Sequence, residues 1–585
     1  MNSQTILARA GLCAGLLAVA APASAQDAAV ALQGLVVTAN RMETPADQVG
    51  SAVTVITGEE MERRQIRFVA DALRSVPGVA VTRSGSVGSL TEVRIRGAEA
   101  NQTLVLIDGI EVNDPASGSQ YDFANLLSAD VERVEILRGP QGVLYGSDAV
   151  GGVVNVITRR GGGKLSAGAS AEGGSFGTVT GNASAAGSAV DDRVRWSLGG
   201  AGFRNTGIST ASEHRGNSEN DSYENATGFA NLSGDILDNL ELSLVGRITD
   251  SERQGDAYFG GVGAVDAHED SQTLQRFGRS DLRLRLLDDK WLHRIGVAVA
   301  DTRTDYDSDG RRTSSYDGTR TALDYQTDLS FDTSAVAAAA HTVTLGLQRE
   351  KDEADSDSDF STFDEDVATQ SVFGLYQLAL AQRLFLTGGL RYDDNDRFED
   401  ATTYRVTAAY LFTETGTKIR GSAGSGVKNP TLFELYGYTP TFVPNPDLKP
   451  EKSHGWDVGL DQRLMGDRLR LGATLFFQRI DDFIAFTGNS VDNVDGESKV
   501  HGVELEAAFD LTAALTLGAT YTYTHAEDAS GDELVRRPKH QASLDLGYRF
   551  LDDRARLDAS LLYIGGRDDY FYDAFYNQER VGLDS

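Results

Sequence analysis

The stretch VERVEILRGPQGVLYGSDAVGGVVNVITRR, residues 131–160, decides how the rest of the chain must be arranged. It contains two short apolar runs, Val134–Leu137 and Val153–Ile157, separated by a segment with glycines at 139, 142, 146, 151 and 152. Short β-prone runs punctuated by glycine predict strands joined by tight turns. The segment has too few large apolar side chains for a core of its own, so we expect another part of the chain to enclose it.

The composition favours a large β protein that does not bind nucleic acid. The chain has 585 residues, enough for several domains, and a formal net charge of −32 from 86 acidic and 54 basic residues. Nucleic-acid binding requires a basic face, which this acidic chain does not favour. The 63 glycines and 20 tyrosines indicate β structure, and the mean hydropathy of −0.28 excludes a bundle of apolar helices.

Residues 1–25 have the pattern of a cleaved signal peptide. Arg9 precedes the apolar run Ala10–Ala21, and Ala23-Ser24-Ala25 supplies the small residues of a cleavage site. A transmembrane helix is the weaker alternative, since the run is too short to cross a bilayer. The single cysteine, Cys13, lies in this segment, so we expect a mature protein without disulfides.

Residues 26–44 predict a flexible leader that carries one β-prone run, Leu35–Ala39. Two interpretations of this run are open. It is either an edge strand, which the residues alone favour, or a segment kept free to pair with a partner's sheet edge through main-chain hydrogen bonds.

Residues 45–160 predict a small α+β domain. Thr57 and Glu60 have the spacing of a helix-capping pair, and the apolar residues that follow share a helical face, which predicts one helix over Thr57–Ser75. Pro77 and Gly78 end it. Further β-prone runs predict strands at Val53–Thr57, Val79–Val81, Glu92–Ile95 and Thr103–Asp108.

After about residue 163 the chain alternates apolar and polar residues in runs of about ten. In Leu240–Ile248 and Arg468–Gln478, leucines recur on one face at alternate positions, and similar runs at Leu515–Thr524 and Gln541–Phe550 carry aromatic residues towards their ends. This pattern is typical of the lipid-facing strands of a membrane β-barrel. A soluble β-sandwich would alternate too, but with shorter strands, so residues 161–585 predict a barrel.

The polar connections between these runs come in two lengths. Asp288–Lys290 and Leu551–Asp553 predict tight turns, whereas Ser251–Gln275, Asp305–Thr321 and Asp352–Ala368 predict long acidic loops. Short turns on one side and long loops on the other are typical of the periplasmic and extracellular ends of outer-membrane barrels. We expect a closed barrel, because an open sheet edge cannot be satisfied in lipid.

Several motifs resemble those of one known family, the TonB-dependent outer-membrane receptors. Residues 93–97 (VRIRG), 104–109 (LVLIDG), 134–140 (VEILRGP) and 145–155 (YGSDAVGGVVN) resemble the plug domain of these receptors. Residues 445–451 (NPDLKPE) and 502–504 (GVE) resemble barrel motifs. The residues that fall where the family has its TonB box are Leu35, Val36, Val37, Thr38 and Ala39.

The resemblance implies a plug domain (45–160) inside a transmembrane barrel of the 22-stranded type, in the outer membrane of a Gram-negative bacterium. The family ends in a strand with a terminal aromatic residue, whereas this sequence stops at Gly582-Leu583-Asp584-Ser585, which predicts a C-terminal truncation of about three strands. The implied partners are the periplasmic domain of TonB, outer-membrane lipid and a large, scarce ligand. We expect a monomer.

Within the family, residues 35–41 (LVVTANR) and 428–432 (KNPTL) are most similar to the cobalamin (vitamin B12) transporters. The predicted function is therefore TonB-dependent active transport of cobalamin. Two alternatives remain open: a siderophore or haem receptor of the same architecture, and a passive porin.

The resemblance also implies three groups of site residues. Carboxylates in extracellular loops predict a calcium site, with a solvated acidic loop as the alternative: Glu219, Asp221, Asp256 and Asp266. Positions on plug loops predict ligand contacts: Leu90, Glu92, Glu99, Ala116 and Ser117. Charged residues predict contacts between plug and barrel, with independent surface charges as the alternative: Arg96, Arg138, Glu451 and Glu504.

The sequence gives no sign of an enzyme. It has no serine–histidine–acid arrangement at a nucleophile elbow, no phosphate-binding loop and no zinc-ligand spacing. We therefore predict no catalytic activity.

Overall fold

The computed structural model describes residues 35–36, 38–211, 219–259, 261–333, 338–572 and 578–583. The predictions for the signal peptide, for most of the leader and for Val37 lie outside these residues. Within them, no helix combines the length and the apolar composition needed to cross a bilayer.

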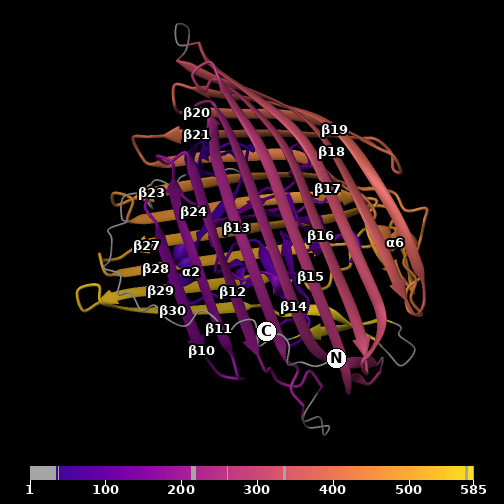
Figure 1. Ribbon diagram of the computed structural model, residues 1–585. Coiled ribbons are helices and arrows are strands. Elements are labelled where there is room, and N and C mark those ends of the chain that lie inside the picture. Colours follow the sequence, from indigo (N-terminus) through magenta and orange to yellow (C-terminus); the bar gives the residue numbers. More distant parts are fainter. Residues whose placement is uncertain are drawn as a thin grey trace.

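The outer part of the molecule, here called the wall, is a 19-stranded sheet whose strands pair antiparallel (Figure 1). Its strands follow the order of the chain, and the hairpin β25–β26 (Ile484–Thr487, Ser490–Asn493) lies outside it. The wall strands are β10 Ser166–Gly173, β11 Val179–Ala189, β12 Val194–Asn205, β13 Tyr223–Leu237, β14 Leu240–Phe259, β15 Gly263–Leu286, β16 Trp291–Ser308, β17 Arg311–Asp332, β18 Ala339–Ser358, β19 Thr362–Leu380, β20 Leu384–Asn395, β21 Ala401–Phe412, β22 Thr417–Lys428, β23 Glu451–Leu464, β24 Leu469–Asp481, β27 Glu497–Asp510, β28 Leu515–Glu527, β29 His540–Phe550 and β30 Ala555–Ile564.

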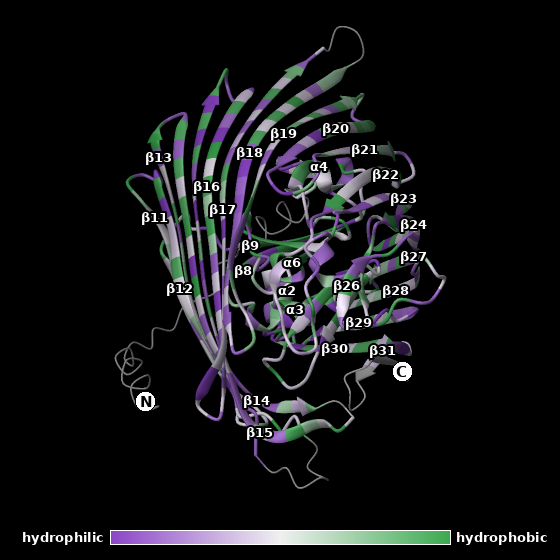
Figure 2. Ribbon diagram, turned by 90° about the vertical axis from the view of Figure 1, so that its right-hand side faces the viewer, coloured by the Kyte–Doolittle hydropathy of each residue, from purple (hydrophilic) through white to green (hydrophobic). Residues whose placement is uncertain are grey.

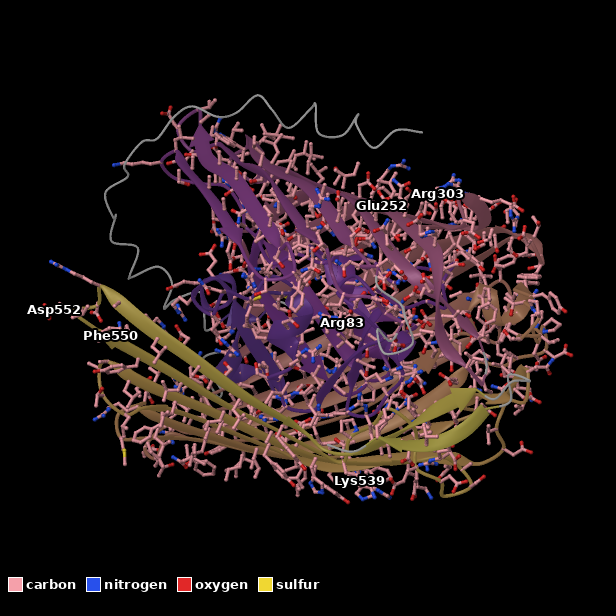
Figure 3. All side chains as sticks on the ribbon, turned by 90° about the horizontal axis from the view of Figure 1, so that it is seen from below. Arg83, Glu252, Arg303, Lys539, Phe550 and Asp552 are labelled. Carbon is pink, nitrogen blue, oxygen red and sulfur yellow. The ribbon has the colours of Figure 1, made fainter. Side chains whose placement is uncertain are left out.

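The wall curls around the rest of the chain. In Figure 3, the yellow strands and the purple strands lie on opposite sides of the indigo segment that the wall encloses. Within the described residues the order ends at β10 and β30, and no ladder joins these two strands. The count of 22 strands stays a prediction.

Alternation along the strands is confirmed by burial. In β24, Leu471 and Leu475 point outwards with 40% and 53% of their surface exposed, while Thr474 and Gln478 are buried on the inner side. Figure 2 shows the same alternation as green and purple bands along the strands. Apolar side chains on the outer face and polar side chains on the inner face are typical of a barrel whose outer surface contacts lipid.

The three predicted long loops are wrong: these segments are strands. Strands β14 to β19 are between 18 and 24 residues long, and residues 251–275, 305–321 and 352–368 belong to their paired ends, apart from short turns. Beyond the lipid both faces of a strand can be polar, so the apolar alternation stops although the backbone ladder continues.

The predicted tight turns are confirmed, and they share one backbone conformation. Leu287, Asp288 and Asp289 all have positive φ, as do Leu551, Asp552 and Asp553. Aspartate tolerates this left-handed region better than most side chains, because its short polar group can bond to the nearby backbone. The recurring Asp-Asp pair is therefore a turn signal in this chain.

The enclosed part of the chain, here called the plug, contains a five-stranded sheet in the order β3-β8-β9-β6-β7. Its central strands, β8 (Val131–Arg138) and β9 (Gly152–Thr158), come from the stretch quoted at the start. The other strands are β3 Val53–Thr57, β6 Thr103–Ile107 and β7 Ile110–Glu111, beside a hairpin of β4 Val79–Arg83 and β5 Thr91–Ile95. The helices are α2 Gly58–Arg63, α3 Val69–Leu73 and α4 Gly142–Tyr145, with single turns η1 Ala46–Gln48, η2 Ala100–Gln102 and η3 Phe123–Asn125.

The plug completes its core with side chains of the wall, as expected from its small apolar content. Ile136 and Val154 are fully buried in a cluster that also contains Phe277, Ala298 and Ala300 of β15 and β16. Figure 2 shows β8, β9 and the plug helices between the two halves of the wall. The wall thus contributes part of the plug's core.

The single helix predicted for residues 57–75 is wrong: two short helices, α2 and α3, replace it. Thr57 caps α2 as expected, accepting a hydrogen bond from the Glu60 amide at 3.2 Å. The chain then leaves the helix at Gln65, which has a φ of 54°. Phe68 packs edge-on against Phe203 of the wall at 4.9 Å between ring centroids, a tertiary contact that helix periodicity could not foresee.

We predict that Gly152→Ala loosens the plug. Gly152 has a φ of 155°, and an added Cβ would stand 2.4 Å from the Leu137 carbonyl oxygen, so β8 and β9 must separate. Overpacking of this kind costs about 1–3 kcal/mol. The measurement is protease digestion of the plug against urea concentration. Gly168→Ala is the control, because a Cβ there meets nothing within 4 Å; equal sensitivity of the two variants would contradict the prediction.

Candidate functional site

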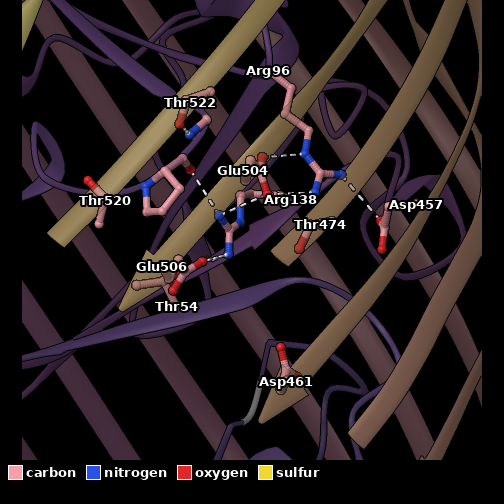
Figure 4. A network of polar contacts seen from close by, with 12 residues as sticks. Thr54, Arg96, Arg138, Asp457, Asp461, Thr474, Glu504, Glu506, Thr520 and Thr522 are labelled. Carbon is pink, nitrogen blue, oxygen red and sulfur yellow. Dashed lines mark hydrogen bonds and ion pairs between the residues drawn. The ribbon is translucent and has the colours of Figure 1, made fainter. Parts of the chain in front are cut away.

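The contact between plug and wall centres on Glu504 of β27 (Figure 4). Arg96, in the turn after β5, donates to its two carboxylate oxygens from Nε at 2.8 Å and from Nη2 at 3.0 Å. The third guanidinium nitrogen donates to Asp457 of β23 at 3.2 Å, and the group lies 4.7 Å from the centre of the Phe476 ring. All three charged side chains are almost entirely buried.

A second plug arginine shares the same carboxylate. Arg138, the last residue of β8, lies 3.0 Å from Glu504 Oε2 and donates to Glu506 at 3.0 Å. The same two nitrogens also donate to the Pro77 carbonyl at 3.0 Å and to Thr54 Oγ1 at 3.1 Å. The predicted contact residues Arg96, Arg138 and Glu504 thus form one network, held by the ends of two plug strands.

Glu451, the fourth predicted contact residue, bonds to the plug without an arginine. One carboxylate oxygen accepts from the side-chain amide of Gln102 at 2.7 Å, and the other accepts from the Ile484 amide at 2.7 Å. The residue is therefore a hydrogen-bond acceptor between plug and wall.

Further ion pairs join plug and wall that the sequence did not identify. They include Arg247–Asp130, Arg320–Glu111, Arg67–Glu172 and Arg537–Glu99. Alternation alone indicates that charged residues of the wall face inwards. It does not say which plug residue each of them meets, because the partners lie far apart in the chain.

The segment predicted as the TonB box lies inside the lumen. β1 (Leu35–Val36) pairs with β2 (Thr44–Pro45), and Val36 is fully buried. Thr38 donates to Glu135 through its amide at 2.9 Å and its hydroxyl at 2.6 Å, while its carbonyl accepts from the Tyr145 hydroxyl at 2.9 Å. Val37 lies outside the described residues.

Wall residues hold the next part of the chain. Arg405 of β21 donates to the Ala39 carbonyl at 2.6 Å, and Lys418 of β22 donates to the Ala46 carbonyl at 2.9 Å. Arg41 lies between the rings of Tyr145 and Phe373, 5.0 and 5.2 Å from their centres. Burial lowers the pKa of Arg41 to about 10, which leaves it charged at neutral pH.

The predicted ligand residues differ in accessibility. Leu90 and Ser117 are exposed. Glu92 is buried beside Arg94 at 3.0 Å, and Glu99 is ion-paired with Arg537 at 2.6 Å. Ala116 is fully buried in a cluster that includes Leu432 of the short helix α6 (Leu432–Tyr436).

Three of the four predicted calcium residues lie together. Each of Glu219, Asp256 and Asp266 offers a carboxylate oxygen within 4.8 Å of the others. The fourth, Asp221, instead accepts a hydrogen bond from the Thr210 amide. Hydrogen bonding to Asp266 raises the pKa of the Glu219 carboxyl.

The donor set fits a hard cation. Among the described residues, Glu219 Oε1 is buried and has no hydrogen-bond partner. Close, like-charged carboxylates favour either a bound cation or a proton, and oxygen ligands are what calcium prefers.

Comparison with known proteins identifies the family. Residues 45–153 match the family model of the TonB-dependent receptor plug domain, and residues 175–582 match that of the TonB-dependent receptor-like β-barrel. The chain belongs to the TonB-dependent receptors, a family of transporters and receptors in the outer membrane of Gram-negative bacteria, which work with TonB and bind large ligands.

Individual relatives fall into two groups. The vitamin B12 transporter BtuB of Photobacterium profundum is 29% identical over 548 residues, which cover 91% of this chain and 84% of that protein. The ferripyoverdine receptor of Pseudomonas aeruginosa superimposes with a TM-score of 0.78 at 15% identity, over 94% of this chain and 81% of that one. The ferric enterobactin receptor PfeA of the same organism superimposes with a TM-score of 0.75 at 18% sequence identity, over 94% of this chain and 91% of that one.

We predict that Glu504→Gln weakens the attachment of the plug. Breaking a buried ion pair from one side leaves charge unpaired and costs about 3–5 kcal/mol. The measurement is hydrogen exchange of β8 and β9 in the purified protein, which we expect to accelerate. Glu506→Gln is the matched control, since Glu506 is 36% exposed and meets only Arg138 of the two arginines. Equal exchange in both variants would rule out Glu504 as the centre of the attachment.

Proposed function

We propose that this receptor imports cobalamin by TonB-dependent active transport. The observation that carries the proposal is the relative named as a vitamin B12 transporter, which aligns over 91% of the chain. The motifs around residues 35–41 and 428–432 support the same ligand. The siderophore receptors share the architecture at 15% and 18% identity, a likeness in fold alone.

In this proposal the plug closes the lumen until TonB acts on the chain near Leu35–Ala39. If this segment were released, TonB could add a strand to it and bind the plug through main-chain hydrogen bonds. The bonds of Thr38 to Glu135 and of Ala39 to Arg405 hold that segment inside until then. No catalytic step is required, and we propose none.

A calcium ion is the proposed structural cofactor of the outer loops. Glu219, Asp256 and Asp266 would hold it, and the cation would neutralise their mutual repulsion and order the chain around Ser209. Ser209 already donates to Asp256 at 3.5 Å. Asp221 could serve as a further ligand only if its carboxylate gave up the hydrogen bond from the Thr210 amide and bound the cation instead.

A ferric siderophore is the second candidate ligand. The solved structures of similar fold are receptors for ferripyoverdine and ferric enterobactin, which favours this alternative at the level of architecture. Binding separates the two: cobalamin at nanomolar affinity supports our proposal, and tight binding of a ferric siderophore without cobalamin binding overturns it.

We predict that deletion of residues 35–39 abolishes energised uptake and leaves ligand binding intact. TonB would lose the strand that it pairs with, while the outer loops remain unchanged. The measurement is uptake and surface binding of radiolabelled cyanocobalamin in whole cells, with a TonB-deficient strain as the reference. Full uptake by the deletion variant would point to a passive porin instead.

We also predict calcium-dependent binding that weakens in acid. Because the pKa of Glu219 is raised, its carboxyl holds a proton at a pH where an ordinary glutamate has lost it, so a lower pH weakens calcium binding. EDTA should lower cobalamin affinity, and Asp256→Asn should weaken calcium binding by at least about tenfold. Asp309→Asn, in another hairpin turn, is the control; unchanged calcium affinity in Asp256→Asn would exclude this site.

A further inference from the structure

A groove of about 590 Å³ lies on the outer face of the wall, across strands β16 to β20. These strands are consecutive neighbours in the sheet, and Figure 1 shows β17, β18 and β19 side by side. Side chains of β18 that point to the lumen, such as Thr344, are buried, so the groove lies on the face that contacts lipid. Its apolar lining is between 47% and 56% exposed and consists of Ile295, Leu323, Leu347 and Val372.

The groove crosses the border between the apolar and the polar part of this outer face. On β18, the outward side chain of Leu347 is followed on the same face by Arg349 and Lys351. Strands β19 and β20 make the same change at Gln370 and Asp394, which also belong to the groove. The polar side of the border lies away from the short turns, towards the end predicted to be extracellular. A lipid in the groove would therefore have its headgroup beside Arg349 and its chains along the apolar residues.

The polar rim of the groove is a row of three side chains on adjacent strands. Arg349 stands opposite Gln370 in the β18–β19 register, and Gln370 stands opposite Asp394 in the β19–β20 register. All three side chains are exposed. Within the part of the chain that the structure describes, none of these side chains takes part in an ion pair or a hydrogen bond. The rim therefore offers a cation, an amide and a carboxylate to a molecule from outside.

Other outward-facing cations near the same border are paired with carboxylates of the wall. The distances are 3.0 Å for Arg276–Asp301, 2.6 Å for Lys351–Glu353 and 3.1 Å for Arg479–Glu497. A cation on the lipid-facing side of a barrel is unfavourable to a degree that depends on its depth, and an anionic partner offsets this cost. Arg349 differs from these cations because the wall supplies no such partner and a groove lies beside it.

We propose that this groove binds a phosphorylated glycolipid of the outer leaflet, with a phosphate on Arg349 and acyl chains along Leu323, Leu347 and Val372. A guanidinium group can hold a phosphate through two parallel charged hydrogen bonds. The amide of Gln370 can donate to the same headgroup, and Asp394 can accept from a sugar hydroxyl. The site is independent of the transported ligand, so the inference stands apart from cobalamin import.

The shape and charge of the groove favour a lipid over a free phosphate ion. A free ion would meet one exposed guanidinium group, with the carboxylate of Asp394 two strands away opposing it. Acyl chains that fill the groove add packing contacts that a small anion cannot make. The apolar lining and the rim therefore act on different parts of one amphipathic molecule.

The test is binding of diphosphoryl lipid A to the full-length protein, purified in detergent and freed of lipid, measured by native mass spectrometry. Arg349→Gln should weaken binding by at least about tenfold, because a hydrogen bond between two charged groups is lost. Arg479→Gln is the matched control, since Arg479 faces outwards near the same border and already pairs with Glu497. Equal affinities of Arg349→Gln and the unchanged protein overturn the proposal.

A second pair of variants tests the apolar part of the groove. Val372→Trp fills it and leaves Arg349 in place, so we expect weaker binding of lipid A. Val458→Trp is the control, because Val458 is exposed to a similar extent on β23, outside the groove. Equal weakening by both tryptophans contradicts the proposal. Far-UV circular dichroism identifies folded variants, and Arg349→Lys, which should bind with intermediate affinity, replaces Arg349→Gln if that variant does not fold.

Competition separates the lipid from a small anion. We expect that neither inorganic phosphate in large excess nor the deacylated headgroup at equal concentration displaces lipid A. Displacement by inorganic phosphate identifies a small-anion site and overturns the proposal. Displacement by the deacylated headgroup shows that the groove contributes nothing, and equally tight binding of dephosphorylated lipid A excludes a role for Arg349; either result also overturns it.

Discussion

Two buried arginines on one buried carboxylate hold the plug in the wall. Glu504 accepts from Arg96 and pairs with Arg138, and Asp457 and Glu506 take the remaining charge. Loss of one partner destabilises such a network, because it leaves the opposite charge buried without compensation. The plug strands end where these arginines stand, so the position of β5 and β8 in the lumen depends on the network.

A plug without a full core of its own has a consequence for transport. Its apolar cluster includes Phe277, Ala298 and Ala300 of the wall, so its packing depends in part on contacts with the wall. On that side Arg279 pairs with Asp281 and Asp324 of the wall and also donates to the Gly109 carbonyl of the plug at 3.5 Å. A plug that depends on the wall for its ion pairs and for part of its core is compatible with a stopper that opens and closes again.

Local patterns made much of the fold predictable. Glycine-punctuated runs predicted β8 and β9, alternation predicted the wall strands, and the Asp-Asp pairs marked the turns, since each depends on neighbours in the chain. The errors arose where tertiary contacts replaced local ones. Phe68 packs on Phe203 of the wall and interrupts the predicted helix. The strand ends beyond the lipid lack the alternation of apolar and polar residues from which a strand could be predicted.

The sequence by itself determined the class of the protein, the identity of β8 and β9, and four of the charged residues that join plug to wall, Arg96, Arg138, Glu451 and Glu504. Motifs and periodicity are properties of consecutive residues, so they can be recognised in the sequence without knowledge of the fold. Only the tertiary structure decided that Glu504 serves both arginines, that Thr38 lies bonded to Glu135 inside the lumen, and that Asp221 accepts from the Thr210 amide. These depend on residues from distant strands meeting across a curved wall, and spacing along the chain carries no record of that curvature.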